Sequence, residues 1–166
     1  MEEKFREKAG NTLKSRERII LIDSSILMYG VKGKKRLPIN IESALLDVTE
    51  GARLAVLSST IEELEILRKT KKGKTRIAAD FALELIDRLG IHMINVDEET
   101  LKKVRMKARK KPKYEFYDEI LAEMAEKLGA AVATIDMNLV KKLRRRNITC
   151  YYLHGRNWIK VSGFQY

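Results

Sequence analysis

The stretch IILIDSSIL at residues 19–27 places four consecutive apolar residues directly before an acid, Asp23. A short apolar run that contains β-branched residues favours a strand buried on both faces. Four later runs have the same character: RLAVL at 53–57, IHMINV at 91–96, AVATI at 131–135 and ITCYYL at 148–153. The sequence therefore predicts five strands, and WIKV at 158–161 can add a short final strand or an edge hairpin.

Helical patterns lie between these runs. Ile77, Phe81, Leu85 and Leu89 recur at every fourth position, and shorter apolar stripes occur at 61–67 and 121–128. Alternation of strand and helix along the chain indicates an α/β fold around a parallel sheet.

The length and composition favour one compact domain. The 166 residues are 45% hydrophobic, which suffices for one sizeable core. Residues 1–17 show no sustained apolar period and are expected to form a short arm, with the folded domain at 18–166. The single cysteine, Cys150, and the lack of a long apolar stretch argue against a disulfide scaffold, a membrane span and a signal peptide. We therefore expect a cytoplasmic protein.

Positive charge is concentrated in four acid-free segments at 32–36, 68–76, 102–113 and 141–146. These hold 23 of the 34 lysines and arginines, so the rest of the chain has a net charge of −12. Any one such run can be an ordinary solvated helix face. Four runs around an acidic remainder favour an enzyme that acts on a polyanion such as RNA.

Acids stand where ligands usually bind in a parallel sheet, beyond the carboxyl ends of the strands. Asp23, Asp97 and Asp136 directly follow predicted strands, Glu63 lies early in the helix after the second strand, and Asp118 opens the helix before the fourth. Each also has a structural explanation. Asp97 is expected to be an N-cap, Glu63 fits the spacing of a capping box with Thr60, and the other three can cap helices too.

Taken together, three or four carboxylates form the oxygen-rich donor set that Mg²⁺ or Mn²⁺ requires. A metal held in this way can activate water and stabilise the charge on a phosphodiester. Competing chemistry is weaker, because His92 and His154 lie in or beside strands and Cys150 has no evident base.

The segments IILIDSSIL (19–27), SSTIEELEIL (58–67), YDEILAEMA (117–125) and VATIDMNLVKKLRRRNI (132–148) resemble the PIN-domain ribonucleases. The resemblance covers residues 18–162 and, at the C-terminus, is greatest to the branch associated with small-subunit rRNA processing and its archaeal relatives. It implies a five-stranded parallel sheet, with metal-binding and catalytic roles for Asp23, Glu63, Asp118 and Asp136. Ser24 and Thr134 match supporting polar positions. Asn138 stands where many members carry another acid, so a single metal is the safer expectation, unless Glu119 compensates.

The leading hypothesis is a Mg²⁺- or Mn²⁺-dependent endoribonuclease that acts on RNA, with an rRNA precursor as the expected substrate. Residues expected to contact RNA are Arg68, Lys69, Lys71, Lys72, Lys74, Arg76, Arg109, Lys110, Lys111, Lys113 and Tyr114. The aromatic residues at 114–117 can equally pack in the core. Two alternatives remain: a ribosome-assembly factor that binds RNA without cutting it, and the toxin of a toxin–antitoxin pair. A homo-oligomer or a ribosome-assembly partner is the further expectation for its assembly.

Overall fold

The computed structural model describes residues 18–29, 41–48, 51–109, 115–154 and 157–161. The predicted arm at 1–17 and the basic run at 32–36 lie outside these ranges. Within them, no helix combines the length and the apolar character needed to cross a bilayer.

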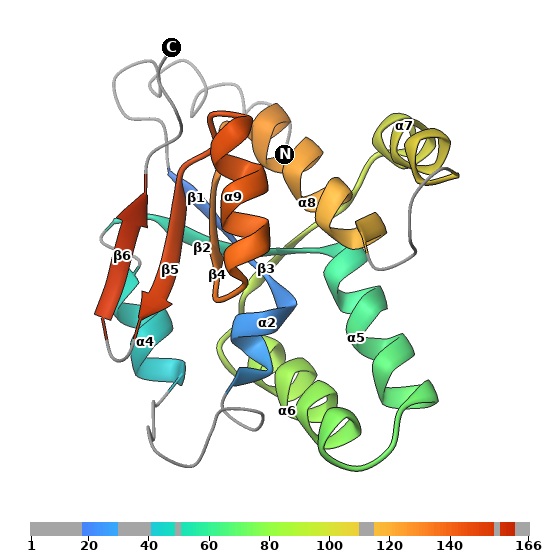
Figure 1. Ribbon diagram of the computed structural model, residues 1–166. Helices are drawn as coiled ribbons and strands as arrows, with labels where there is room; N and C mark the ends of the chain where they lie inside the picture. The colour runs from blue at the N-terminus through green and yellow to red at the C-terminus, as the bar shows by residue number, and fades with distance from the viewer. Residues whose placement is uncertain (1–17, 30–40, 49–50, 110–114, 155–156, 162–166) are drawn as a thin grey trace, which may run out of the picture.

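A central sheet of six strands has the spatial order β3-β2-β1-β4-β5-β6 (Figure 1). Its strands are β1 (Ile19–Ile22), β2 (Arg53–Leu57), β3 (His92–Ile94), β4 (Ala131–Thr134), β5 (Cys150–His154) and β6 (Asn157–Val161). The first five run parallel, which confirms the predicted α/β sheet. The sixth strand, β6, pairs antiparallel with β5, which confirms the edge hairpin that the sequence allowed at 158–161.

The helices are α2 (Ser24–Leu27), α4 (Ile41–Val48), α5 (Ser58–Thr70), α6 (Lys74–Arg88), α7 (Glu98–Ala108), α8 (Glu115–Leu128) and α9 (Met137–Arg145). Two buried clusters show how they cover the sheet. One cluster joins α2, α5 and α6 to one face, and the other joins α7, α8 and α9 to the opposite face.

Strand β1 contributes to both clusters because successive side chains of a strand point to opposite faces. Ile20 and Ile22 belong to the cluster with α6, whereas Leu21 belongs to the cluster with α8, and all three are buried. This explains why its sequence is continuously apolar rather than alternating.

Strand β3 differs from the expectation of a strand buried on both faces. It is only three residues long and lies at the edge of the sheet, where His92 and Met93 are exposed. The apolar run at 91–96 predicts a longer strand that is buried on both faces. An apolar sequence does not distinguish an edge strand from a central one, because that difference depends on which strands pair with it in the fold.

Helix α8 ends where the sequence predicts. Gly129 follows its last residue with φ = +62°, a left-handed conformation that glycine adopts without steric cost. The amide of Ala130 then donates back to the carbonyl oxygen of Ala125 at 2.9 Å, which closes the helix and directs the chain into β4. The stop places β4 in register with β1, with Ala133 opposite Ile22.

Candidate active site

Four carboxylates come from four elements that meet at the carboxyl end of the sheet. Asp23 follows β1, Asp136 follows the neighbouring strand β4, Glu63 lies in the second turn of α5, and Asp118 lies in the first turn of α8. The starts of α2, α5, α8 and α9 gather at this end of the sheet (Figure 1). The fold therefore brings together the four acids that the sequence analysis selected.

Asp23 is the most buried of the four, at 8% exposed. Its Oδ2 accepts hydrogen bonds from Thr134 Oγ1 at 2.8 Å and from Ser25 Oγ at 2.6 Å. Burial raises the pKa of this carboxyl, the two hydroxyls oppose the rise, and the nearby charge of Asp136 adds to it. The hydroxyls thus orient a carboxylate that would otherwise be costly to bury.

Glu63 is oriented by a residue far away in the sequence. Ser24 Oγ donates to Glu63 Oε1 at 3.2 Å. The capping-box interpretation is wrong, because α5 already begins at Ser58 and Thr60 therefore lies inside the helix. Burial, followed by the charges of Asp23 and Asp118, raises the pKa of Glu63 to about 7.

Asp118 shares this electrostatic environment. Burial first, then the charges of Asp23 and Asp136, raise its pKa to about 7, and the ammonium group of Lys142 acts in the opposite direction. The four carboxylates are therefore close enough to affect one another's ionisation. Nearby like charges of this kind recur at catalytic sites.

Asp136 is exposed and has two roles. Its Oδ1 caps α9 by accepting from the backbone amides of Asn138 at 2.9 Å and Leu139 at 3.4 Å, so the capping interpretation holds for this residue. Its own amide donates to Thr134 Oγ1 at 3.0 Å. Thr134 thereby links Asp136 to Asp23, which gives the predicted supporting residue a defined position.

Other predicted residues have varied outcomes. Asp97 is an N-cap, as expected, and accepts from the amide of Thr100 at 3.1 Å. Asn138 is exposed beside the cluster at the start of α9. Glu119 does not supplement the carboxylates, because it is buried and forms ion pairs with Lys142 and with Arg146.

Two residues near the cluster were not selected from the sequence. Ser25 donates to Asp23 and accepts from the amide of Ile135 at 3.3 Å, and the second serine of the DSS triplet was its only signal. Lys142 was counted only as part of a basic run, yet it is the lysine whose charge reaches Asp118. Lys142 is brought near Asp118 because α9 packs against α8, and the sequence alone does not reveal that packing.

The donor set fits a hard divalent cation. Carboxylate oxygens are the preferred ligands of Mg²⁺ and Mn²⁺. In the described part of the chain, no lysine or arginine nitrogen forms an ion pair with Asp23, Glu63, Asp118 or Asp136. The four side chains do not form a closed ligand set, since no three His, Cys, Asp or Glu residues in the described ranges could hold one ion. The carboxylates fit a metal by their chemistry and by their clustered negative charge, which Lys142 offsets in part at Asp118.

The basic residues predicted to contact RNA fall in two places. Lys69, Lys71, Lys72, Lys74 and Arg76 are exposed around the turn between α5 and α6. Arg68 is partly exposed, and its Nε lies 3.7 Å from Asp80 Oδ1. Arg109 is exposed at the C-cap of α7. Lys110, Lys111, Lys113 and Tyr114 lie outside the described residues.

A profile of the PIN-like domain family matches residues 20–156, which include all four carboxylates. The chain belongs to the PIN-like family. Its members are generally metal-dependent nucleases, and the arrangement of acids described above agrees with that general activity.

Solved structures share the fold of this PIN-like chain. VapBC2 from Rickettsia felis, in complex with a DNA fragment from its promoter, contains a chain that is 14% identical, with a TM-score of 0.57, over 82% of this chain and 99% of that one. FitAB bound to a DNA fragment gives 17% identity and a TM-score of 0.52, over 83% and 99% of the two chains. The curated proteins contain no match to this sequence.

Proposed function

We propose that this PIN-like protein is a Mg²⁺- or Mn²⁺-dependent endoribonuclease in which Asp23, Glu63, Asp118 and Asp136 hold the metal. The observation that carries the proposal is the convergence of these four carboxylates at the carboxyl end of the sheet, with like charges that raise one another's pKa values. A cation bound there would offset that repulsion.

The bound metal would supply Lewis-acid stabilisation of the phosphodiester and activation of the attacking water. The protein's own groups prepare the site for it. The hydroxyls of Thr134 and Ser25 fix Asp23, and Ser24 fixes Glu63. Because the nucleophile would be water activated by the metal, hydrolysis would proceed without a covalent enzyme intermediate.

Cleavage of labelled single-stranded and stem-loop RNA tests the proposal directly. We expect cutting with Mn²⁺ or Mg²⁺, none with EDTA, and none by Asp136→Asn. The matched control is Asp87→Asn, which makes the same chemical change on the exposed surface of α6 and should cut as wild type does. Full activity of both Asp136→Asn and Asp23→Asn would refute the catalytic assignment.

The second candidate is a toxin ribonuclease that functions with a protein partner. The comparison favours it, since the VapBC2 and FitAB structures, which share the fold at TM-scores of 0.57 and 0.52, are described as complexes bound to DNA. Expression of the chain should then arrest growth in a manner that depends on Asp136, and co-expression of the partner should restore growth. The rRNA-processing assignment and the non-cleaving assembly factor rest on the sequence alone. Tight RNA binding without a metal-dependent product would support the latter.

A further inference from the structure

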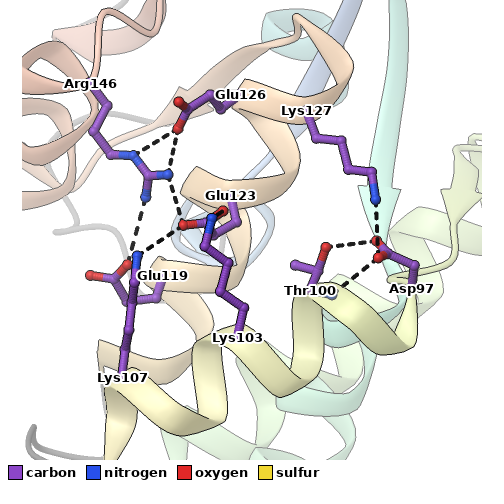
Figure 2. Close-up of polar contacts among 9 residues, drawn as sticks. All are labelled: Asp97, Thr100, Lys103, Lys107, Glu119, Glu123, Glu126, Lys127 and Arg146. Atoms are coloured by element: carbon purple, nitrogen blue, oxygen red, sulfur yellow. Dashed lines mark hydrogen bonds and ion pairs between the residues drawn. The ribbon is translucent and has the colours of Figure 1, made fainter.

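The basic run at 102–113 is divided by helix α7 into two faces with different partners. Lys103 and Lys107 are one turn apart and both face α8, where their Nζ atoms lie 3.1 and 3.2 Å from the carboxylate of Glu123 (Figure 2). These two ammonium groups share one carboxylate, which holds both side chains toward α8, so they are poorer candidates for contact with a polyanion than cations without an acidic partner.

The outward face carries a different set. Lys102, Arg105 and Arg109 are spaced by three and four residues, which places them on one side of a helix. All three are exposed, and within the described ranges none has an acidic partner. Met106 lies between them and is 72% exposed. We call Lys102, Arg105, Met106 and Arg109 the α7 stripe.

Ion pairs at three positions join helix α7 to α8. At its beginning, Asp97 pairs with Lys127 at 3.1 Å, and further along, Lys103 and Lys107 pair with Glu123 (Figure 2). These pairings make α7 antiparallel to α8, so the C-terminal end of α7 approaches the first turn of α8, which carries Asp118.

Charge is graded along the stripe. The acids Glu98 and Glu99 occupy the first turn of α7, and the cations follow from Lys102 toward Arg109. The positive charge therefore increases toward the carboxylate cluster. From Lys102 to Arg109 a helix rises about 10 Å. A polyanion lying along this face is attracted toward the catalytic end.

We propose that the α7 stripe is an RNA-binding site outside the carboxylate cluster, which holds the sugar–phosphate backbone of single-stranded RNA as it enters the active site. Met106 supplies an apolar contact to a base or a ribose between the charged positions. The proposal rests on the ribonuclease function proposed above. It adds to it a defined entry path and excludes Lys103 and Lys107 from that path.

The test compares two double variants of the same helix with equal loss of charge. Lys102→Gln/Arg105→Gln removes two cations of the stripe, and Lys103→Gln/Lys107→Gln removes the two that face Glu123. Binding of a single-stranded RNA of about 20 nucleotides is measured in EDTA as a function of salt, after circular dichroism has shown that each variant is folded. If the second variant is not folded, Lys103→Gln/Lys127→Gln replaces it as the control.

Loss of two phosphate contacts should lower RNA affinity on the order of 10- to 30-fold at 0.1 M salt and reduce the slope of log K against log salt by about 1.4. The control variant should stay within about threefold of wild type, because its two side chains are directed to Glu123 on α8 and not to the outward face. Equal losses in the two variants, no loss in the stripe variant, or a wild type that does not bind RNA would each overturn the proposal.

A second measurement separates this proposal from the proposed activity. With Mn²⁺, the stripe variant should lose kcat/KM on the long RNA but cut a trinucleotide as wild type does, since the proposal places the stripe where only RNA that extends beyond the carboxylate cluster binds. Cutting of both substrates at wild-type rates would refute the stripe and leave the ribonuclease intact. RNA binding that depends on the stripe, without any cutting by the wild type, would refute the ribonuclease and leave the stripe intact.

Discussion

Replacement of Glu119 by glutamine should be among the most destabilising single changes on the surface between α8 and α9. Glu119 is 6% exposed, and it forms ion pairs with Lys142 Nζ and with Arg146 Nη1, the latter at 3.7 Å. Removing one partner of a buried ion pair costs about 3–5 kcal/mol, because the remaining charge is left without compensation.

The expected cost here is smaller than that range. The side chains of Lys142 and Arg146 remain 27% and 23% exposed, so water partly solvates them after the change. Arg146 also keeps its ion pairs with Glu123 and Glu126 (Figure 2). We therefore expect a loss of about 2–3 kcal/mol in the free energy of unfolding. For a chain of this size, that loss lowers the melting temperature by about 4–12 °C.

Urea denaturation in EDTA, followed by circular dichroism, measures the loss directly. The control is Glu126→Gln, which removes the same charge from the same helix and the same arginine, but from a side chain that is 56% exposed. An exposed pair contributes about 0–1 kcal/mol. The reasoning is refuted if Glu119→Gln costs no more than Glu126→Gln.

Three further predictions concern the site, the ion pairs and the core. Burial and neighbouring acids raise the pKa values of Glu63 and Asp118 to about 7, so protons compete with the metal below that pH. Mn²⁺ affinity should therefore increase from pH 6 to pH 8, and calorimetry in two buffers should detect proton release; affinity that is constant with pH would contradict this. Partial burial opposes the shift at Glu123, yet hydrogen bonds from Lys103, Lys107 and Arg146 lower its pKa to about 2. The ionised Glu123 therefore stabilises the fold above pH 4.5, and this contribution is lost as the pH falls toward 2. Glu123→Gln should destabilise the protein at pH 6 much more than at pH 2. Urea titrations at the two pH values measure this difference. Burial raises the pKa of the Cys150 thiol to about 11. The thiol should therefore resist a thiol reagent at pH 8 until urea unfolds the protein. Rapid labelling of the native protein would contradict the placement of β5 in the core.

The sequence predicted the strands and the acids at their ends because those features are local. The run at 19–22 followed by Asp23 identifies a buried strand and the residue at its carboxyl end. Parallel pairing then brings Asp23 and Asp136 to the same edge, which follows from topology alone. The stretch at 158–161 forms the additional edge strand that the sequence allowed, and it pairs antiparallel with β5.

What the sequence could not supply depends on contacts between distant segments. The hydrogen bond from Ser24 to Glu63 joins residues 39 positions apart. Local spacing predicts a capping box for Glu63 instead, which the structure does not form because α5 begins at Ser58. The ion pairs of Glu119 could not be predicted for the same reason. Its position beside Asp118 in the sequence does not indicate that cations of α9 lie next to it. Helical spacing shows that α7 has two basic faces, but only the packing against α8 shows which one is directed to an acid, Glu123.

Strand β6 also gives the protein an internal spectroscopic reporter. Trp158 is the only tryptophan in the chain, and its indole Nε1 donates to the carbonyl oxygen of Ala44 on α4 at 2.7 Å. Its fluorescence therefore senses a contact between two segments 114 positions apart, whereas circular dichroism averages over every helix. If the two signals change at the same urea concentration, the last strand and α4 separate only when the whole domain unfolds. If the fluorescence changes first, this corner of the sheet opens as a unit of its own.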